Sequence, residues 1–178
     1  MSAGRAARDR LSNFQGRHSL VATTPFLPSS DFPWAASLEA ATPAIQRELH
    51  NVLAHPERIP AFHQMSPDQR RISRGDHWKT YGFYVFGNAI DENCAECPET
   101  ANAIGDIPGL QNAWFSILAP GYHVPPHRGP TRAVVRCHLG LEVPKPPEAC
   151  WLRVADQRRH WVEGECLFFD DTFEHEVH

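Results

Sequence analysis

Apolar and polar positions along the chain predict one packing helix followed by a series of short strands. In residues 42–53 four apolar side chains recur at the spacing of one helical face: Ile45, Leu49, Val52 and Leu53. The Thr42-Pro43 pair in front of them is typical of a helix start, and Pro56 ends the helix. From Trp78 the sequence WKTYGFYVFG is aromatic and β-rich, and it ends at a Gly-Asn turn.

The second half of the chain predicts a sandwich or barrel. Residues 92–110 indicate a loop and a short helix that begins near Pro98. Four later runs are short and bounded by Pro, Gly or charged residues: 113–118, 133–143, 150–155 and 166–169. The expected fold is therefore mainly β with flanking helices.

The domain organisation expected from the sequence is simple. Residues 1–30 are polar and show no sustained period, which predicts a flexible N-terminal arm. We expect a single domain over residues 31–178, with a helical part over residues 31–75.

The predicted strand at residues 132–143 has two unlike faces. One face is apolar throughout: Ala133, Val135, Cys137, Leu139, Leu141 and Val143. The other face carries Arg136 and His138, so it either faces solvent or lines a polar cavity. His127 lies a few residues upstream and favours the cavity, where the planar guanidinium of Arg136 is well shaped to bind a carboxylate.

Composition is that of an ordinary globular protein, with 42% hydrophobic and 21% charged residues. The 21 acidic and 17 basic side chains give a formal charge of -4, which argues against overall attraction to nucleic acid or anionic membranes. No apolar stretch is long enough to cross a bilayer and the N-terminus lacks a secretory core, so we expect a cytoplasmic protein. The oligomeric state is left open.

Five cysteines include one close pair, Cys94 and Cys97. A zinc site would need two more ligands, and a redox pair would need a helix start within a βαβ unit. A structural role in a loop is favoured over either chemistry.

Two histidines stand where predicted strands end: His127 in GYHVPPHRGP and His175 in FFDDTFEHEVH. Imidazole is a common metal ligand, and two imidazoles from distant strands can meet on one ion, although most histidines bind no metal. Pro125 and Pro126 prevent a helix that would align His123 with His127. We therefore expect His123 to lie on the surface or to contact a metal ligand, not to bind a metal itself. The ending HEVH does not match the zinc-protease pattern HExxH.

From about Trp78 to its end, the chain resembles the aspartyl/asparaginyl β-hydroxylase family of iron(II)- and 2-oxoglutarate-dependent oxygenases. The resemblance rests on WFSILAPGYHVPPHRGP, VVRCHLGLEVP, WVEGECLFFDD and FEHEVH, in that order. It implies a double-stranded β-helix, which is a cupin-like jelly roll. It also implies an activity that uses O2 and converts 2-oxoglutarate to succinate while an unactivated C–H bond is hydroxylated.

The resemblance also implies residue roles. His127 and His175 would ligate iron, and a water would take the third place, because Gly129 stands where most such oxygenases have a carboxylate. Separately from the resemblance, the position of Asp171 four residues before His175 indicates that it either orients that water as a catalytic group or caps a turn. 2-Oxoglutarate would be held by residues on separate strands: Ser116, Arg136 and His138.

The chain departs from the family at its end. The family usually supplies an arginine about ten positions after the second histidine, whereas this chain ends at His178. We therefore expect a form that is truncated or lacks the last strand of the jelly roll, with weak 2-oxoglutarate binding. The alternative function is a non-catalytic jelly-roll binding module or a truncated, inactive homologue.

The substrate class is open between three kinds of molecule: a protein or peptide Asp or Asn side chain, a lipid and a small molecule. Trp78, Lys79 and residues 94–99 are the candidates for substrate contact.

Overall fold

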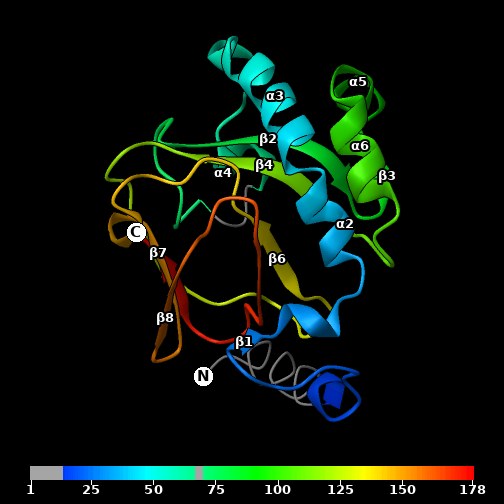
Figure 1. Cartoon of the computed structure of the whole chain (residues 1–178). Coiled ribbons are helices and arrows are strands. Elements are labelled where there is room, and N and C mark those ends of the chain that lie inside the picture. The colour runs from blue at the N-terminus through cyan, green and yellow to red at the C-terminus, as the bar shows by residue number, and fades with distance from the viewer. Residues whose placement is uncertain (1–13, 67–69) are drawn as a thin grey trace. The chain divides into compact units, whose positions relative to one another are not determined.

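The computed structural model describes residues 14–66 and 70–178 (Figure 1). By contacts the chain forms two compact units, one of residues 1–33 with 125–178 and one of residues 34–124. Strands and helices are both present and strands dominate the second half, so the predicted mainly β chain with helices is confirmed. Of the arm predicted for residues 1–30, residues 1–13 lie outside the described part of the chain.

The unit of residues 34–124 is built on a three-stranded antiparallel sheet of order β3-β2-β4. Its strands are β2 (Trp78–Val85), β3 (Asn88–Ala89) and β4 (Ala113–Leu118). Its helices are α2 (Ala35–Ala40), α3 (Thr42–Leu53), η2 (Pro56–Arg58), α4 (Phe62–Met65), α5 (Asp91–Glu96) and α6 (Pro98–Gly105). In Figure 1, α3, α5 and α6 lie together on one side of β2 and β4.

The predicted helix of residues 42–53 is confirmed as α3, and it buries Ile45, Leu49 and Val52 as the spacing requires. The sheet buries aromatic rings. Phe83 meets the ring of Phe115 edge-on at 4.9 Å between centroids, a favoured geometry for such pairs. The apolar face of α3 and these rings supply the buried apolar side chains that hold the unit together.

One buried carboxylate joins two helices of this unit. Glu48 of α3 is only 9% exposed and accepts hydrogen bonds from the backbone N–H groups of Glu99 and Thr100, at 2.9 and 2.7 Å. The Thr100 hydroxyl donates to the same carboxylate at 2.6 Å. These N–H groups belong to the first turn of α6, where they have no partner within the helix and where negative charge is favoured.

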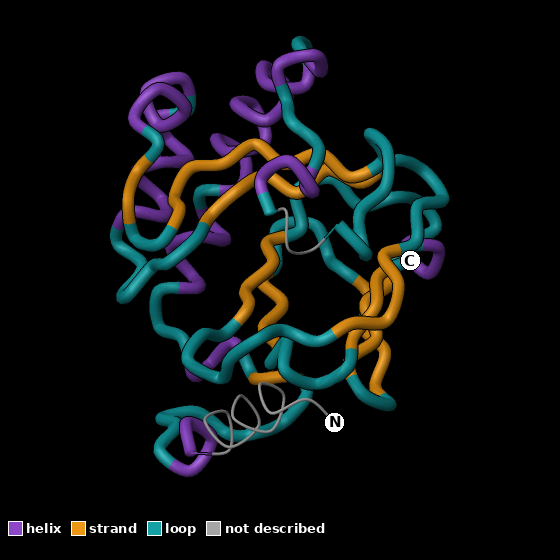
Figure 2. Tube along the Cα trace, turned by 180° about the vertical axis from the view of Figure 1, so that it is seen from behind, coloured by secondary structure: helices purple, strands orange, loops and turns teal. Residues whose placement is uncertain are grey.

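The unit of residues 1–33 and 125–178 contains two sheets, seen from the opposite side in Figure 2. The first has the order β1-β9-β6, with β1 (Phe26–Leu27), β9 (Cys166–Phe169) and β6 (Arg136–Leu139). The second has the order β5-β10-β7-β8, with β5 (Val124–His127), β10 (His175–Val177), β7 (Trp151–Val154) and β8 (Gln157–His160). Two short 3-10 helices are η1 (Ser29–Asp31) and η4 (Pro147–Ala149).

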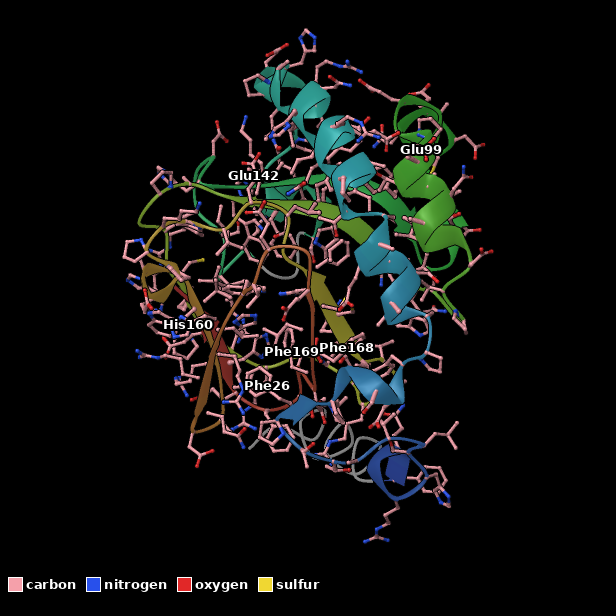
Figure 3. All side chains as sticks on the ribbon, in the orientation of Figure 1. Phe26, Glu99, Glu142, His160, Phe168 and Phe169 are labelled. Carbon is pink, nitrogen blue, oxygen red and sulfur yellow. The ribbon has the colours of Figure 1, made fainter. Side chains whose placement is uncertain are left out.

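Aromatic residues tie the N-terminal strand to this unit. Phe26 of β1 pairs with Phe169 of β9, and the Phe32 ring stacks on the Phe168 ring at 4.1 Å (Figure 3 labels Phe26, Phe168 and Phe169). Phe168 and Phe169 are almost fully buried.

The strand predicted over residues 133–143 is shorter than expected. It forms only over Arg136–Leu139, and none of its four residues is fully buried. At its end, Gly140 packs against the backbone of Val162 so closely that a Cβ would lie 2.4 Å from the Val162 carbonyl oxygen. The predicted strand over residues 132–143 was therefore too long at both ends, and the close approach of Gly140 to the Val162 backbone lies where β6 ends.

The Glu48 contact predicts a specific loss of stability. Glu48→Ala removes three hydrogen bonds and leaves the first turn of α6 without its buried acceptor, so the free energy of unfolding should fall by about 2 kcal/mol. Urea unfolding followed by circular dichroism measures this, and Glu92→Ala on the exposed first turn of α5 is the control. Equal unfolding midpoints for Glu48→Ala and the unchanged protein would contradict this role.

Candidate active site

The two strand-end histidines lie together. β5 and β10 are neighbours in one sheet, and they carry His127 and His175. The centroids of the two rings are 4.1 Å apart and their planes are inclined by 53°. His175 is 6% exposed and His127 is partly buried. Sheet pairing therefore brings together two imidazoles that are 48 positions apart in the sequence.

Both imidazoles are held in the same way by their own backbone. The His127 Nδ1 lies 2.8 Å from the Pro125 carbonyl oxygen, and the His175 Nδ1 lies 3.0 Å from that of Phe173. A carbonyl oxygen only accepts, so each Nδ1 carries the proton and each Nε2 carries a lone pair. Metal-ligating histidines are commonly oriented by such a hydrogen bond to a backbone carbonyl.

Burial keeps the His175 ring neutral. Burial lowers the pKa of His175, and this effect outweighs the opposite effect of the bond to the Phe173 carbonyl and of the Asp171 carboxylate. A neutral imidazole is the form that ligates a metal.

Gly129 and Asp171 are in direct contact. The Gly129 N–H donates to the Asp171 carbonyl oxygen at 2.7 Å. A Cβ on residue 129 would lie only 2.1 Å from Asp171 Oδ1 and 2.5 Å from Oδ2. The carboxylate of Asp171 therefore fills the space that a side chain at position 129 would need.

The Asp171 carboxylate is buried, and only one of its two oxygens accepts a hydrogen bond. The residue is 3% exposed, and Arg136 Nε donates to its Oδ2 at 2.7 Å. Its Oδ1 is buried without a hydrogen-bond partner. A buried carboxylate oxygen that lacks a donor is costly, and such an atom indicates a place where a water or an ion completes the site.

The turn before His175 is capped by the neighbouring residue. Asp170 Oδ1 accepts from the backbone N–H of Thr172 at 2.9 Å and from its hydroxyl at 2.6 Å. Of the two roles left open for Asp171, side-chain capping of this turn is thus performed by Asp170.

Arg136 and His138 lie two positions apart on β6, so they share one face of the strand. Burial, with a further contribution from the positive Arg136 guanidinium, lowers the pKa of His138 to about 4. The Phe169 ring meets His138 edge-on at 5.0 Å and His175 at 5.6 Å. The prediction did not include Phe169, which forms a buried aromatic wall shared by these two imidazoles.

The other predicted residues have partners of their own. Ser116 is an exposed residue of β4 in the unit of residues 34–124, and its hydroxyl accepts from Trp78 Nε1 at 2.9 Å. Lys79 Nζ donates to the Pro56 carbonyl oxygen. His123 is exposed, and the His178 ring stacks on Trp151 at 5.3 Å.

A cluster of potential metal ligands and a membrane-spanning helix are both absent from residues 14–66 and 70–178. No set of three or more His, Cys, Asp or Glu side chains is arranged there to hold a metal ion. No helix in that part of the chain is both long and apolar enough to span a membrane.

The CxxC pair belongs to the α5–α6 region and is reduced. Cys94 and Cys97 are free thiols, and Cys97 is 1% exposed. Burial, with a further contribution from the Glu48 carboxylate, raises the pKa of Cys97 to about 12. A helix start normally favours a thiolate, but here burial outweighs it.

Two imidazoles on neighbouring strands and a buried carboxylate define a candidate active site, and comparison with known proteins identifies the family. Residues 39–178 match the family model described as aspartyl/asparaginyl β-hydroxylase. The chain belongs to this family of hydroxylases.

Relatives with established names agree with this assignment. The ornithine lipid ester-linked acyl 2-hydroxylase of Rhizobium tropici is 43% identical over 161 residues, which are 90% of this chain and 57% of that protein. Aspartate β-hydroxylase domain-containing protein 2 of Rattus norvegicus is 39% identical over 55% of this chain and 29% of its own length. The aspartyl/asparaginyl β-hydroxylase of Homo sapiens is 36% identical over 62% of this chain and 15% of its own length. The chain thus matches less than two thirds of each relative.

The contact between Gly129 and Asp171 predicts that position 129 tolerates no side chain. Gly129→Ala would place a methyl group inside the Asp171 carboxylate, so the free energy of unfolding should fall by at least about 2 kcal/mol. Gly105→Ala, whose new Cβ has no atom within 4 Å, should instead leave stability unchanged or raise it slightly. Chemical denaturation of both variants is the test, and equal effects would contradict the steric assignment.

The Cys97 environment predicts an unreactive thiol. At pH 8 almost none of the thiol is ionised, so alkylation of the native protein at Cys97 by iodoacetamide should be about a hundredfold slower than alkylation of glutathione. Mass spectrometry of timed, quenched samples measures the rate, and unfolding in urea should remove the protection. Rapid labelling in the native state would instead indicate a reactive CxxC pair.

Proposed function

We propose that the chain is an iron(II)- and 2-oxoglutarate-dependent dioxygenase that hydroxylates an unactivated C–H bond. The observation that carries the proposal is the pairing of His127 and His175, whose Nδ1 atoms are both held by backbone carbonyls two residues earlier. The two sheets of this unit support the double-stranded β-helix on which such sites are built.

The residues present fit a bound iron. His127 and His175 would supply two neutral nitrogen ligands, the type that suits this metal. A water bound to the metal would donate a hydrogen bond to the buried Asp171 Oδ1. This bond would satisfy the one carboxylate oxygen that lacks a donor. Arg136 holds the same carboxylate through Oδ2 and so fixes its direction. When bound, iron(II) with O2 and 2-oxoglutarate supplies the oxidising chemistry for hydroxylation.

Arg136 and His138 of β6 would hold 2-oxoglutarate, and Ser116 is the further residue that the family resemblance assigns to it. A guanidinium has five N–H donors, so the bond of Arg136 to Asp171 is compatible with a second carboxylate. His138 is kept neutral by burial and would donate one N–H without adding charge. The Ser116 hydroxyl accepts from Trp78, which directs its own O–H as a donor to another group.

A lipid acyl chain is the substrate class that we favour. The relative that matches 90% of this chain is named as an acyl 2-hydroxylase of an ornithine lipid, whereas the aspartyl/asparaginyl β-hydroxylase matches 62%. An Asp or Asn side chain of a protein is the competing substrate, and hydroxylation assays with both kinds of molecule distinguish them.

Histidine variants test the proposal. His127→Ala and His175→Ala should weaken Mn²⁺ binding in calorimetry by at least about a hundredfold and abolish succinate release from 2-oxoglutarate under iron and ascorbate. Asp171→Asn keeps the shape but weakens the acceptor, so activity should fall by about ten- to a hundredfold. His160→Ala, on the exposed strand β8, is the control and should leave both measurements unchanged.

Two outcomes would decide against the enzyme. Metal affinity that is unchanged in both histidine variants would remove the proposed iron site. Binding of metal and 2-oxoglutarate without any succinate release would support the alternative of a non-catalytic binding module.

A further inference from the structure

The described N-terminal residues form a surface segment, here called the N-terminal segment (residues 14–21), that is fastened to the loop before β6. The Thr131 hydroxyl donates to Gln15 Oε1 at 2.9 Å. Gly16 packs on the Arg132 side chain, where a Cβ would lie 2.7 Å from Nη1. The segment is drawn in dark blue in Figure 1.

Despite these contacts, the segment presents large apolar side chains to the outside. Leu20 is fully exposed and Phe14 is 60% exposed. Among the described residues, the other large exposed apolar side chains are scattered singly along the chain: Met65, Phe86 and Val162. Two such side chains within seven positions form a patch rather than isolated exposure.

A cavity of about 400 Å³ adjoins this patch. The N-terminal segment forms one wall with Phe14, Leu20 and Val21, and residues 133–135 of the loop form the other, all three of them apolar. A space of this size with mostly apolar walls suits an extended hydrocarbon chain.

The N-terminal part of the sequence carries a net charge opposite to that of the whole chain. Residues 1–24 contain four arginines and one aspartate, a net charge of +3, whereas the complete chain carries -4. Arg17 and His18 lie between the two exposed apolar side chains, and both are exposed. Clustered basic residues interleaved with exposed Phe and Leu are typical of a segment that lies in the interface of an anionic bilayer.

We infer that the N-terminal segment docks this protein on the surface of an anionic lipid bilayer. Leu20 and Phe14 enter the acyl region, and the exposed Arg17 side chain between them contacts the lipid headgroups. The net negative charge of the whole chain does not oppose this docking. Electrostatic attraction to the membrane surface decays within about a Debye length, so it depends on the charge of the docking segment. The inference rests on the proposed function in one respect, namely that a lipid substrate has to be drawn from a membrane.

The docking surface is connected to the candidate site within the same unit. Arg132, which contacts Gly16, donates from Nε to the Thr172 hydroxyl at 3.1 Å. Thr172 directly follows Asp171, the carboxylate beside the histidine pair. An acyl chain held in the cavity would thus lie in the unit that also carries the two imidazoles.

Vesicle binding of the full chain, without metal or 2-oxoglutarate, tests the inference. The protein should sediment with vesicles of about 70% phosphatidylcholine and about 30% phosphatidylglycerol, a share of anionic lipid similar to that of many membranes. It should sediment much less with vesicles of phosphatidylcholine alone. Leu20→Ser and Phe14→Ser should each lower the partition coefficient by about tenfold, and Arg17→Gln by about fivefold. Raising the salt concentration should weaken binding of the unchanged protein.

Two exposed apolar residues elsewhere provide matched controls. Val162→Ser and Phe86→Ser remove similar exposed surface and should leave vesicle binding unchanged. No binding to the anionic vesicles, equal losses for the control variants, or full binding by the Leu20→Ser and Phe14→Ser double variant would overturn the inference. Since the assay needs no turnover, a membrane-bound protein that releases no succinate would count against the proposed function alone.

Discussion

The Asp171 carboxylate lies against the backbone of Gly129 while Arg136 holds one of its oxygens, and the candidate site is arranged around this contact. The contact joins the turn after β5, the strand β6 and the turn before β10. Because each of these segments also carries one of the candidate ligand-binding side chains, the position of the carboxylate fixes theirs. A buried carboxylate is tolerated here since a guanidinium compensates part of its charge.

The histidine pair depends on a different and more local constraint. Each ring is oriented by the carbonyl of the residue two positions earlier in the chain, so its orientation is set by local backbone geometry. Sheet pairing then needs only to bring the two strands together. Orientation and proximity are supplied by separate interactions, and neither requires a third protein ligand.

Sequence reasoning located the elements whose pattern is local. The helix α3 and the strands β4 and β9 were predicted with their bounds, because apolar spacing and flanking Pro or Gly residues mark them. The length of β6 was overestimated, since its end depends on the backbone of Val162, which approaches Gly140 from a distant part of the chain. The family resemblance supplied the roles of the site residues, whereas composition and spacing alone indicated only a metal-binding pair.

Contacts that depend on strand register could not be predicted. Phe169 lies between His138 and His175 because β6 and β9 pair with Arg136 opposite Phe169, and no sequence pattern specifies that register. The sequence left open whether Asp171 caps a turn, and the turn geometry shows that the Asp170 side chain does so. The patch of Phe14 and Leu20 was also missed, because the polar composition of the segment concealed two exposed apolar side chains.

The filled space at Gly129 has an evolutionary consequence. A carboxylate side chain introduced at position 129 is blocked while Asp171 occupies that volume. The two positions are therefore epistatic, because a smaller residue at position 171 is required before position 129 can carry a side chain. The intermediate between the two arrangements would have no carboxylate at either position, so a glycine at 129 and an aspartate at 171 are expected to persist together.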